Sequence, residues 1–271
     1  MDKSQDVIVC CIAKREQNYI REFVEHNLSI GFDRVVIGDN DEQDSKDTPV
    51  AEILKDYVAS GKVKVVDLRG QKAQQMPFYN RIIREEPYKW CAFLDVDEFI
   101  AFSDNGRFKN IKEFLKFRPE VKAYKVQWLM YNDNGHITKT EGKLSERFPT
   151  PMPQTTSANR HTKSILRKDF HGTFHHNPHV VVCRPGENYF MPSGRHTDTT
   201  AFNTPYDYSE VYIKHYYTKS LEEWIKNKMH RGYADHIIAD KTKSYPISTY
   251  FGYNERTPEK EQFLKEHGFS I

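Results

Sequence analysis

Runs of consecutive apolar residues alternate with amphipathic segments over residues 1–103 of the chain. Four runs have the length of a strand that is buried on both faces, namely residues 6–13, 34–38, 62–68 and 90–94. The segments between them place apolar residues at helical spacing and predict three helices, over residues 16–30, 50–60 and 74–85. Strands that alternate with helices in this order predict βαβ units and a parallel sheet.

The pattern becomes irregular in the second half of the chain. Residues 148–159 contain three prolines and no periodicity, so they are predicted to form a long loop and a candidate lid. Residues 221–231 are predicted to form a helix, because Ser220 and Glu223 make a capping box at its start. The other predicted elements are a helix over residues 111–117 and strands over residues 123–131, 162–167, 180–182 and 211–216.

Charge, hydropathy and cysteine content limit the classes of function. The chain has 271 residues with 40 basic and 38 acidic side chains and no basic block, so a nucleic-acid partner is not expected. No apolar run approaches the length of a membrane span, so we expect peripheral membrane contact at most. The four cysteines form no Cys-x-x-Cys pair, which favours reduced thiols in a cytoplasmic protein, at most peripheral at the inner membrane face.

Polar clusters follow three of the predicted strands, at the point where each strand ends. The clusters are Lys14-Arg15-Glu16, Asp39-Asn40-Asp41 and Asp95-Val96-Asp97-Glu98. Because a parallel sheet binds its ligand beyond the carboxyl ends of its strands, we expect these clusters to line one site. The last cluster lies inside the apolar stretch CAFLDVDEFIAF, and burying its three carboxylates requires a positive partner.

An Asp-x-Asp sequence at the end of a buried strand suits a hard divalent cation. Mg²⁺ or Mn²⁺ typically takes one or two protein carboxylates and completes its shell with water and substrate phosphates. The alternative is a turn with solvated acids, because Asp-x-Asp is common by chance. Zinc at a second histidine group is a weaker alternative, because Gly172 and Pro178 prevent a regular helix there. That group consists of His171, His175, His176 and His179.

Four segments, in order along the chain, resemble the motifs of GT-A fold glycosyltransferases. They are AKREQNYIREFVEHNLSIGFDRVVIGDN (13–40), QQMPFYN (74–80), LDVDEFI (94–100) and HYYTKSLEEWIKNKMHRG (215–232). The combination is similar to the bacterial family-two-like enzymes and the related eukaryotic family ninety-two. The resemblance implies an α/β fold of the GT-A type, a Rossmann-like, mostly parallel central sheet flanked by helices, with an irregular C-terminal acceptor lobe.

The resemblance also implies how the chain is divided and which residues bind the donor. It implies a single domain over residues 1–271, with a nucleotide-sugar-binding half (1–103) and an acceptor-binding half with C-terminal helices (104–271). The residues expected to bind the nucleotide-sugar are Ala13, Lys14, Arg15, Asp39, Asn40, Gln75, Asn80, Asp95 and Lys219. The expected ligands of Mn²⁺ or Mg²⁺ are Asp95, Asp97 and His215. Arg15 replaces the Asn usual in the family.

Lys219 and His215 can be interpreted either as ligand-binding residues or as residues with a purely structural role. Lys219 precedes a predicted helix, whose N-terminal N–H groups suit an anion, so the two side chains would complete a diphosphate clamp. Without the resemblance, a packed histidine and a solvated lysine would be the preferred interpretation.

The implied reaction moves a hexose from a nucleotide-sugar, UDP-galactose or UDP-glucose, to a glycan acceptor in surface polysaccharide synthesis. An inverting transfer needs a general base within hydrogen-bonding reach of the acceptor hydroxyl. Glu146 is the first candidate and matches a family pattern; Glu141 and Asp198 are the alternatives, and a structural pairing of Glu146 with Lys143 or Arg147 remains open. His179 is a further candidate catalytic residue. Trp128 and Tyr131 are candidates to stack on the acceptor, and packing in the core is the alternative role for Trp128.

Two other functions compete with this interpretation. A phosphatase of the haloacid-dehalogenase type also uses Asp-x-Asp after a strand, but after its first strand, whereas here the motif follows the fourth. A non-catalytic nucleotide-sugar or carbohydrate-binding protein of the same fold is the second alternative. Metal-dependent hydrolysis of a UDP-sugar separates an enzyme from a binding protein.

Overall fold

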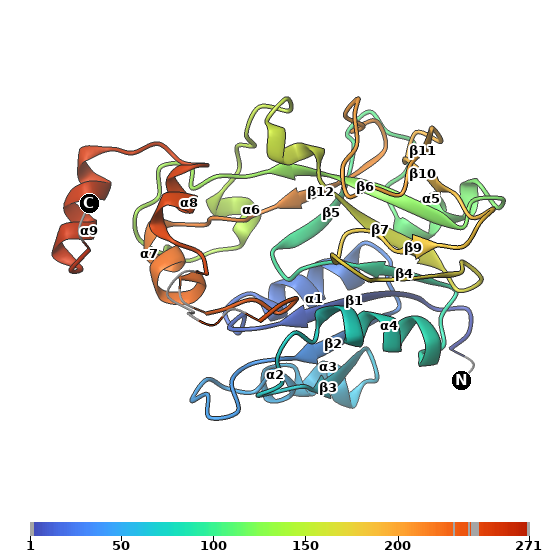
Figure 1. Ribbon diagram of the computed structural model, residues 1–271, viewed down its shortest axis with the longest axis horizontal. Helices are drawn as coiled ribbons and strands as arrows, with labels where there is room; N and C mark the ends of the chain where they lie inside the picture. The colour runs from blue at the N-terminus through green and yellow to red at the C-terminus, as the bar shows by residue number, and fades with distance from the viewer. Residues whose placement is uncertain (1–2, 230, 238, 240–243, 270–271) are drawn as a thin grey trace.

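The computed structural model describes residues 3–229, 231–237, 239 and 244–269, and a mixed β-sheet lies at its centre (Figure 1). Within the described residues the ten-stranded sheet has the order β11-β10-β6-β7-β4-β1-β2-β3, and β12 pairs with both β6 and β5. Its strands are β1 (Val7–Ala13), β2 (Arg34–Asp39), β3 (Val63–Asp67), β4 (Trp90–Phe93), β5 (Glu98–Phe102), β6 (Ala123–Met130), β7 (Thr162–Arg167), β10 (Tyr189–Phe190), β11 (His196–Thr197) and β12 (Val211–His215). A second sheet pairs β8 (Gly172–Thr173) with β9 (Val182–Cys183).

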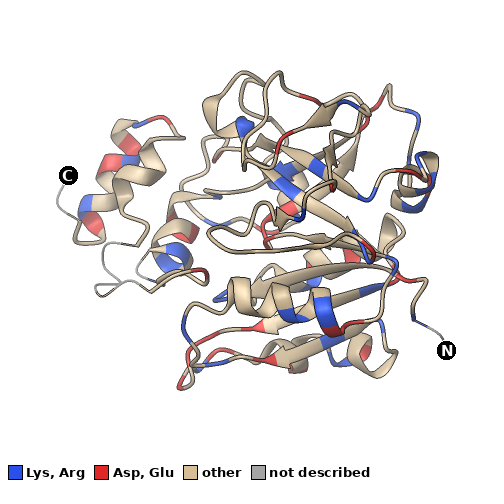
Figure 2. Ribbon diagram, turned by 45° about the vertical axis from the view of Figure 1, so that its right-hand side comes forward, with Lys and Arg blue, Asp and Glu red and all other residues tan. Residues whose placement is uncertain are grey.

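Helices flank the sheet and form the C-terminal part of the chain. They are α1 (Ile20–Ser29), α2 (Val50–Ile53), α3 (Lys55–Ala59), α4 (Gln75–Glu85), α5 (Ile111–Phe117), α6 (Leu144–Arg147), α7 (Leu221–Glu223), α8 (Ile247–Phe251) and α9 (Pro258–Glu266), with a 3₁₀ turn η1 (Ser157–Arg160) and a π-helix η2 (Trp224–Lys228). The α/β architecture predicted from the sequence is confirmed. Where the structure describes the chain, no helix combines the length and apolar character needed to cross a membrane. Figure 2 shows basic and acidic residues interspersed along the ribbon.

The parallel half of the sheet is built around β1. Strands β3, β2, β1 and β4 pair in parallel, and all residues of β1 are buried. Successive residues of β1 face opposite sides: Val9 packs in the same core as Phe23 of α1, and Cys10 packs with Phe78 of α4. The continuous apolar run in the sequence therefore reflects a strand covered by α1 on one face and by α4 on the other.

The chain leaves the parallel half directly after β4. The Asp-x-Asp residues form the turn, and β5 then pairs antiparallel with β12, which places Glu98 opposite His215. The Tyr216 N–H donates to the carbonyl of Asp97 at 2.9 Å, so this pairing fixes the turn as well. β5 was not among the predicted strands, because its partner lies far away in the sequence.

Antiparallel strands extend the sheet on the other side of β4. β7 pairs with β4 and β6, and β6 pairs in parallel with β12. This arrangement carries Lys163 of β7, Trp128 of β6 and His215 of β12 toward the Asp-x-Asp turn. Strands from both halves of the chain therefore assemble one site.

The C-terminal elements differ most from the sequence prediction. The helix predicted over residues 221–231 is α7 followed by the π-helix η2, which ends at Lys228. Helices α8 and α9 are C-terminal helices of the kind expected, but their bounds were not predicted; they pack with α7 around Trp224, Tyr250 and Leu264 at one end of the molecule (Figure 1). The helix predicted over residues 50–60 is two short helices that meet at Leu54. Side-chain spacing alone does not reveal a change of helix type or a break between turns.

Candidate active site

The Asp-x-Asp turn lies against a cavity of about 290 Å³ at the carboxyl end of the parallel strands. Asp95 keeps 35% of its side-chain surface exposed there, whereas Asp97 and Glu98 are buried. The cavity wall includes Lys14, Gln75, Asp95, Asp97, Trp128, His179, His215, Lys228 and Arg231. Several sequence-predicted residues therefore meet at one place, as the strand-end clusters suggested.

Lys163 is the positive partner of the first aspartate. Its ammonium is fully buried, 2.8 Å from Asp95 Oδ2 and 3.7 Å from Glu98 Oε1. Burial opposes a charged lysine, but the two carboxylates outweigh it and raise the pKa of Lys163. Gln75 donates to Asp95 Oδ1 at 2.9 Å and fixes the carboxylate from the other side. Glu98 accepts from the Asp95 N–H at 2.9 Å, which supports the turn.

Asp97 is held by three cationic or imidazole groups. Lys228 Nζ lies 3.0 Å and Lys219 Nζ 3.6 Å from Asp97 Oδ2, and His215 Nε2 lies 3.4 Å from Oδ1. Burial alone would raise the pKa of Asp97, but Lys228, Lys219 and His215 together hold it well below its usual range. Asp97 is therefore a carboxylate despite its burial.

His215 is a neutral imidazole at the cavity wall. Burial lowers its pKa, and its Nδ1 has no hydrogen-bond partner among the described residues. A neutral imidazole and a carboxylate are both competent ligands for Mn²⁺. No group of three or more His, Cys, Asp or Glu side chains in the described ranges forms a complete metal cage. A cation at this turn would thus rely on Asp97, His215 and oxygens of a bound substrate.

Aromatic and imidazole rings form another part of the wall, next to His215. The Trp128 ring lies 4.2 Å from the ring of His215 and 5.2 Å from that of His179, centre to centre, and stacks on His161 at 4.8 Å. His179 donates from Nδ1 to the Thr162 carbonyl at 2.9 Å, because the carbonyl can only accept. Burial, with Lys163 nearby, lowers the pKa of His179 to about 3, so the ring is neutral.

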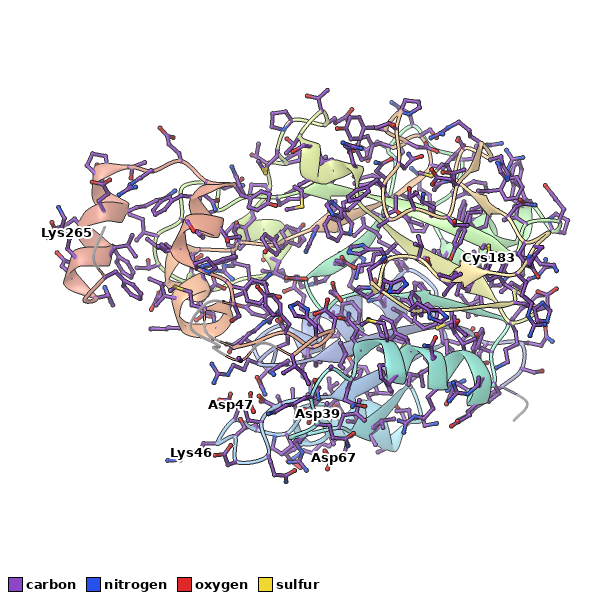
Figure 3. The ribbon with its side chains drawn as sticks, viewed as in Figure 1. Asp39, Lys46, Asp47, Asp67, Cys183 and Lys265 are labelled. Atoms are coloured by element: carbon purple, nitrogen blue, oxygen red, sulfur yellow. The ribbon has the colours of Figure 1, made fainter. Side chains whose placement is uncertain are left out.

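Other predicted donor residues have structural roles. Asp39, labelled in Figure 3, accepts from the Val50 N–H at the start of α2, and burial raises its pKa. Asn40 donates to the Leu68 carbonyl at 2.9 Å. Asn80 exchanges two hydrogen bonds with the backbone of Phe174, each at 2.8 Å.

The remaining members of the predicted donor set surround the cavity without lining it. The cavity lining, as the structure describes it, excludes Ala13, Arg15, Asp39, Asn40, Asn80 and Lys219. Ala13 accepts from the Asn40 N–H, and Arg15 adopts a positive φ of 54° beside a neighbouring cavity. Lys219 contacts Asp97 without lining the described part of the cavity, and its Nζ lies 4.4 Å from the centre of the Tyr19 ring.

The three carboxylates considered as general base, Glu141, Glu146 and Asp198, do not line the cavity as the structure describes it, and Glu141 is exposed. Glu146 is exposed and accepts from the Lys143 N–H at 3.0 Å, so it caps α6. Asp198 is 65% exposed and pairs with the buried ammonium of Lys125 at 3.0 Å. Tyr131 is also displaced from the site: it is buried against Tyr216, at 4.9 Å between ring centres. Among the predicted catalytic and acceptor residues, His179 and Trp128 line the cavity.

The predicted lid does not line the cavity as the structure describes it. Residues 148–159 support β6, since the Met152 N–H donates to the Met130 carbonyl at 2.8 Å. A later segment lines the cavity instead, and we call it the cover: Arg231, Tyr233, Ala234, Asp235, His236 and Tyr245. Arg231 anchors this cover by donating to the Lys14 carbonyl at 3.1 Å and by pairing with Glu16 at 2.5 Å.

Sequence reasoning missed Lys163, Lys228 and the covering segment. Lys163 stands in the strand TKSILR, in which Ile165 and Leu166 are the apolar residues, so the local sequence does not mark this lysine as buried. Nothing local distinguishes Lys228 from its exposed neighbour Lys226.

The fold and the site together define an α/β protein whose Asp-x-Asp turn, with lysine and histidine partners, lies at the carboxyl edge of the parallel strands. Residues 5–246 match the description "Glycosyltransferase family 92", so the chain belongs to this family.

Known relatives are distant. A glycosyltransferase family 92 protein of Oryza sativa subsp. japonica is 22% identical over 170 residues, which cover 62% of this chain but only 28% of the rice protein. The solved structure of S. aureus TarS 1-349 in complex with UDP-GlcNAc is 16% identical, with a TM-score of 0.37 over 60% of this chain and 46% of that one. The mannosyltransferase PcManGT from Pyrobaculum calidifontis, in complex with GDP-Man and Mn²⁺, is 15% identical, with a TM-score of 0.32 over 46% of this chain and 37% of that one.

Proposed function

We propose that the protein transfers a hexose from a nucleotide-sugar to a hydroxyl of a glycan acceptor with inversion. The observation that carries this proposal is the Asp-x-Asp turn, whose two aspartates line a cavity that also contains lysine, arginine and neutral histidine side chains. In the reaction the acceptor oxygen bonds to the anomeric carbon, the bond from that carbon to the diphosphate breaks, and the hydroxyl proton passes to a base. Family 92 membership supports glycosyl transfer over phosphatase chemistry.

The cationic side of the cavity suits the donor diphosphate. Lys14, Lys228 and Arg231 line it, and fixed positive charge stabilises the leaving diphosphate as its negative charge grows. Mn²⁺ or Mg²⁺ would be held by Asp97 and His215, with Asp95 on the same wall. A bound cation supplies further neutralisation of the leaving group. UDP-galactose and UDP-glucose are the donors we propose, on the basis of the resemblance described above.

The aromatic wall suits the acceptor. Trp128 lines the cavity and is held by His161 and His215, so its ring offers a rigid surface for stacking on a sugar. We propose a glycan of the cell surface as the acceptor class, again from the family resemblance.

A donor screen tests the proposal. Nucleotide-sugars are added singly, with Mn²⁺ or with EDTA, and the unfolding temperature is measured; a ligand at 100 times its Kd stabilises a protein by about 2.7 kcal/mol. We expect a UDP-hexose with Mn²⁺ to raise the unfolding temperature and to be turned over to UDP. If no nucleotide-sugar shifts unfolding under either condition, the proposed function is wrong. Binding without turnover in the presence of glycan acceptors supports the non-catalytic alternative.

We propose His179 as the base, because among the candidate bases it is the one that lines the cavity; burial beside Lys163 lowers its pKa to about 3, which weakens it as a base. Its Nδ1–H is fixed on a backbone carbonyl, so Nε2 is the ring's proton acceptor, and the residue lines the cavity. We expect His179→Ala to lower kcat by about 100-fold, as loss of a general base typically does. Glu146→Gln, which keeps the cap on α6, should leave kcat unchanged. Steady-state kinetics with a saturating UDP-hexose measures both; the reverse order of effects would return the base to Glu146.

A further inference from the structure

Lys228 occupies the side of Asp97 that lies next to the cavity. Its ammonium is 3.0 Å from Asp97 Oδ2 and 2.8 Å from the Tyr217 carbonyl, and it lies 3.8 Å from the centre of the Tyr217 ring. The side chain is only 7% exposed, and it lines the cavity together with Asp97 and His215. The ammonium therefore stands where a ligand of Asp97 would enter.

The two lysines on Asp97 are held differently. Lys219 does not line the described part of the cavity and is fixed by its backbone, at a φ of 55°, and by the ring of Tyr19. Lys228 is the last residue of the π-helix η2, and π-helical turns occur frequently at functional sites. The chain continues from Lys228 into the cover, where the Gln75 N–H donates to the Ala234 carbonyl at 2.9 Å. Of the two, Lys228 is the one with open space beside it.

Lys228 and a divalent cation compete for the same carboxylate. Asp97 Oδ1 faces His215, and Oδ2 is taken by Lys228 and Lys219. A second positive charge within a few ångströms of the ammonium is repelled strongly in a desolvated site. Asp97 can be a metal ligand in this surrounding when the Lys228 ammonium withdraws.

We propose that Lys228 is a displaceable counter-ion of Asp97 and a donor-binding residue. In the donor-free protein its ammonium neutralises Asp97; when the cation enters, the ammonium leaves Asp97 and binds the diphosphate of the nucleotide. This inference rests on the proposed function, because it requires a nucleotide donor and a cation at the site. The exchange makes the two ligands cooperative, since each favours the same position of Lys228.

The test measures binding of Mn²⁺ to the nucleotide-free protein by electron paramagnetic resonance of the free ion. Lys228→Met removes the competing charge, so we expect the variant to bind Mn²⁺ about tenfold more tightly than the wild type. A tenfold change in Kd is about the size expected when one close repulsive charge is removed. The same variant should bind UDP in EDTA less tightly, because the site loses one positive charge and Asp97, no longer neutralised by Lys228, repels the diphosphate. Lys228→Arg keeps the charge and should keep the low Mn²⁺ affinity. Lys226→Met is the matched control, because Lys226 is exposed on the same turn and pairs with Glu222.

A second measurement needs no variant. Acetylation of individual lysines of the wild type is followed by mass spectrometry, with Lys226 as the internal reference. We expect Mn²⁺ alone to increase labelling of Lys228 and added UDP to suppress it again. Unchanged labelling, together with equal Mn²⁺ affinity of Lys228→Met and the wild type, would overturn the inference while UDP binding still supports the proposed function. If neither Mn²⁺ nor UDP binds, and the donor screen is also negative, the proposed function fails as well.

Discussion

Asp97→Asn is expected to lower the rate of sugar transfer strongly and to destabilise the fold. The variant cannot neutralise Lys228 and Lys219, whose ammonium groups lie 3.0 and 3.6 Å from the lost charge. Breaking a buried ion pair by removing one partner costs about 3 to 5 kcal/mol of unfolding free energy. The variant should bind the cation poorly and should no longer hold Lys228 and Lys219 in place. We therefore expect kcat/KM to fall by about 100-fold or more, as it does when one electrostatic group at a reacting centre is removed.

Initial rates with a UDP-hexose and urea unfolding measure the two effects separately. Asp67→Asn is the control, because Asp67 ends β3, which β1 and β2 separate from β4, and pairs with Arg69 at the surface. We expect the control to retain wild-type activity. An Asp97→Asn protein with wild-type kcat/KM would remove Asp97 from the donor site.

Arg147→Met should be the most damaging change away from the cavity. Arg147 makes a two-pronged ion pair with Glu223, with Nη1 2.9 Å from Oε1, and both side chains are almost fully buried. Tyr19 and Ser220 donate to the same carboxylate, so the pair ties α6, α7 and the segment before α1 together. We expect a loss of about 3 to 5 kcal/mol, measured as a lower urea midpoint.

The acid dependence of unfolding gives this prediction an independent readout. Burial alone would raise the pKa of Glu223, but its bonds to Arg147, Ser220 and Tyr19 lower it from 4.5 to about 2. A lowered folded-state pKa means that the stabilisation is complete above pH 4.5 and is lost as the pH falls toward 2. Arg147→Met should weaken this acid-dependent loss. Lys226→Met, which breaks an exposed pair, should change neither the urea midpoint nor the pH profile.

The position of the Asp-x-Asp turn was predictable from local sequence. The apolar run before Asp95 has the length of a buried strand, and the βαβ order places its carboxyl end at the ligand edge. The same logic predicted that Lys14 would lie near it. The strand-end pattern did not reveal that Lys14 lines the cavity whereas Asp39 does not. A side chain at the end of a strand can instead cap a helix, as Asp39 does by accepting from the Val50 N–H.

Residues remote in the sequence decide the electrostatics of the site. Lys163 reaches Asp95 across 68 residues, and Lys228 reaches Asp97 across 131. The positive partner required by the three acids was expected to be a metal; in the structure lysines already fill that role. Glu146 does not lie at the cavity, because its carboxylate caps the short helix α6 by accepting from the Lys143 N–H.

The amino-acid sequence by itself determined the buried strands, the βαβ order and the edge at which the carboxylates emerge. These follow from side-chain periodicity and from the connection rules of parallel sheets, which act over short stretches of chain. Only the tertiary structure decided which cations neutralise those carboxylates, which segment covers the cavity and which candidate base faces it. These features depend on β7, β12 and the π-helix η2, which meet at the Asp-x-Asp turn although they are far apart in the sequence. Because a buried charge without a partner is unfavourable, the lysines and carboxylates at this turn pair with one another.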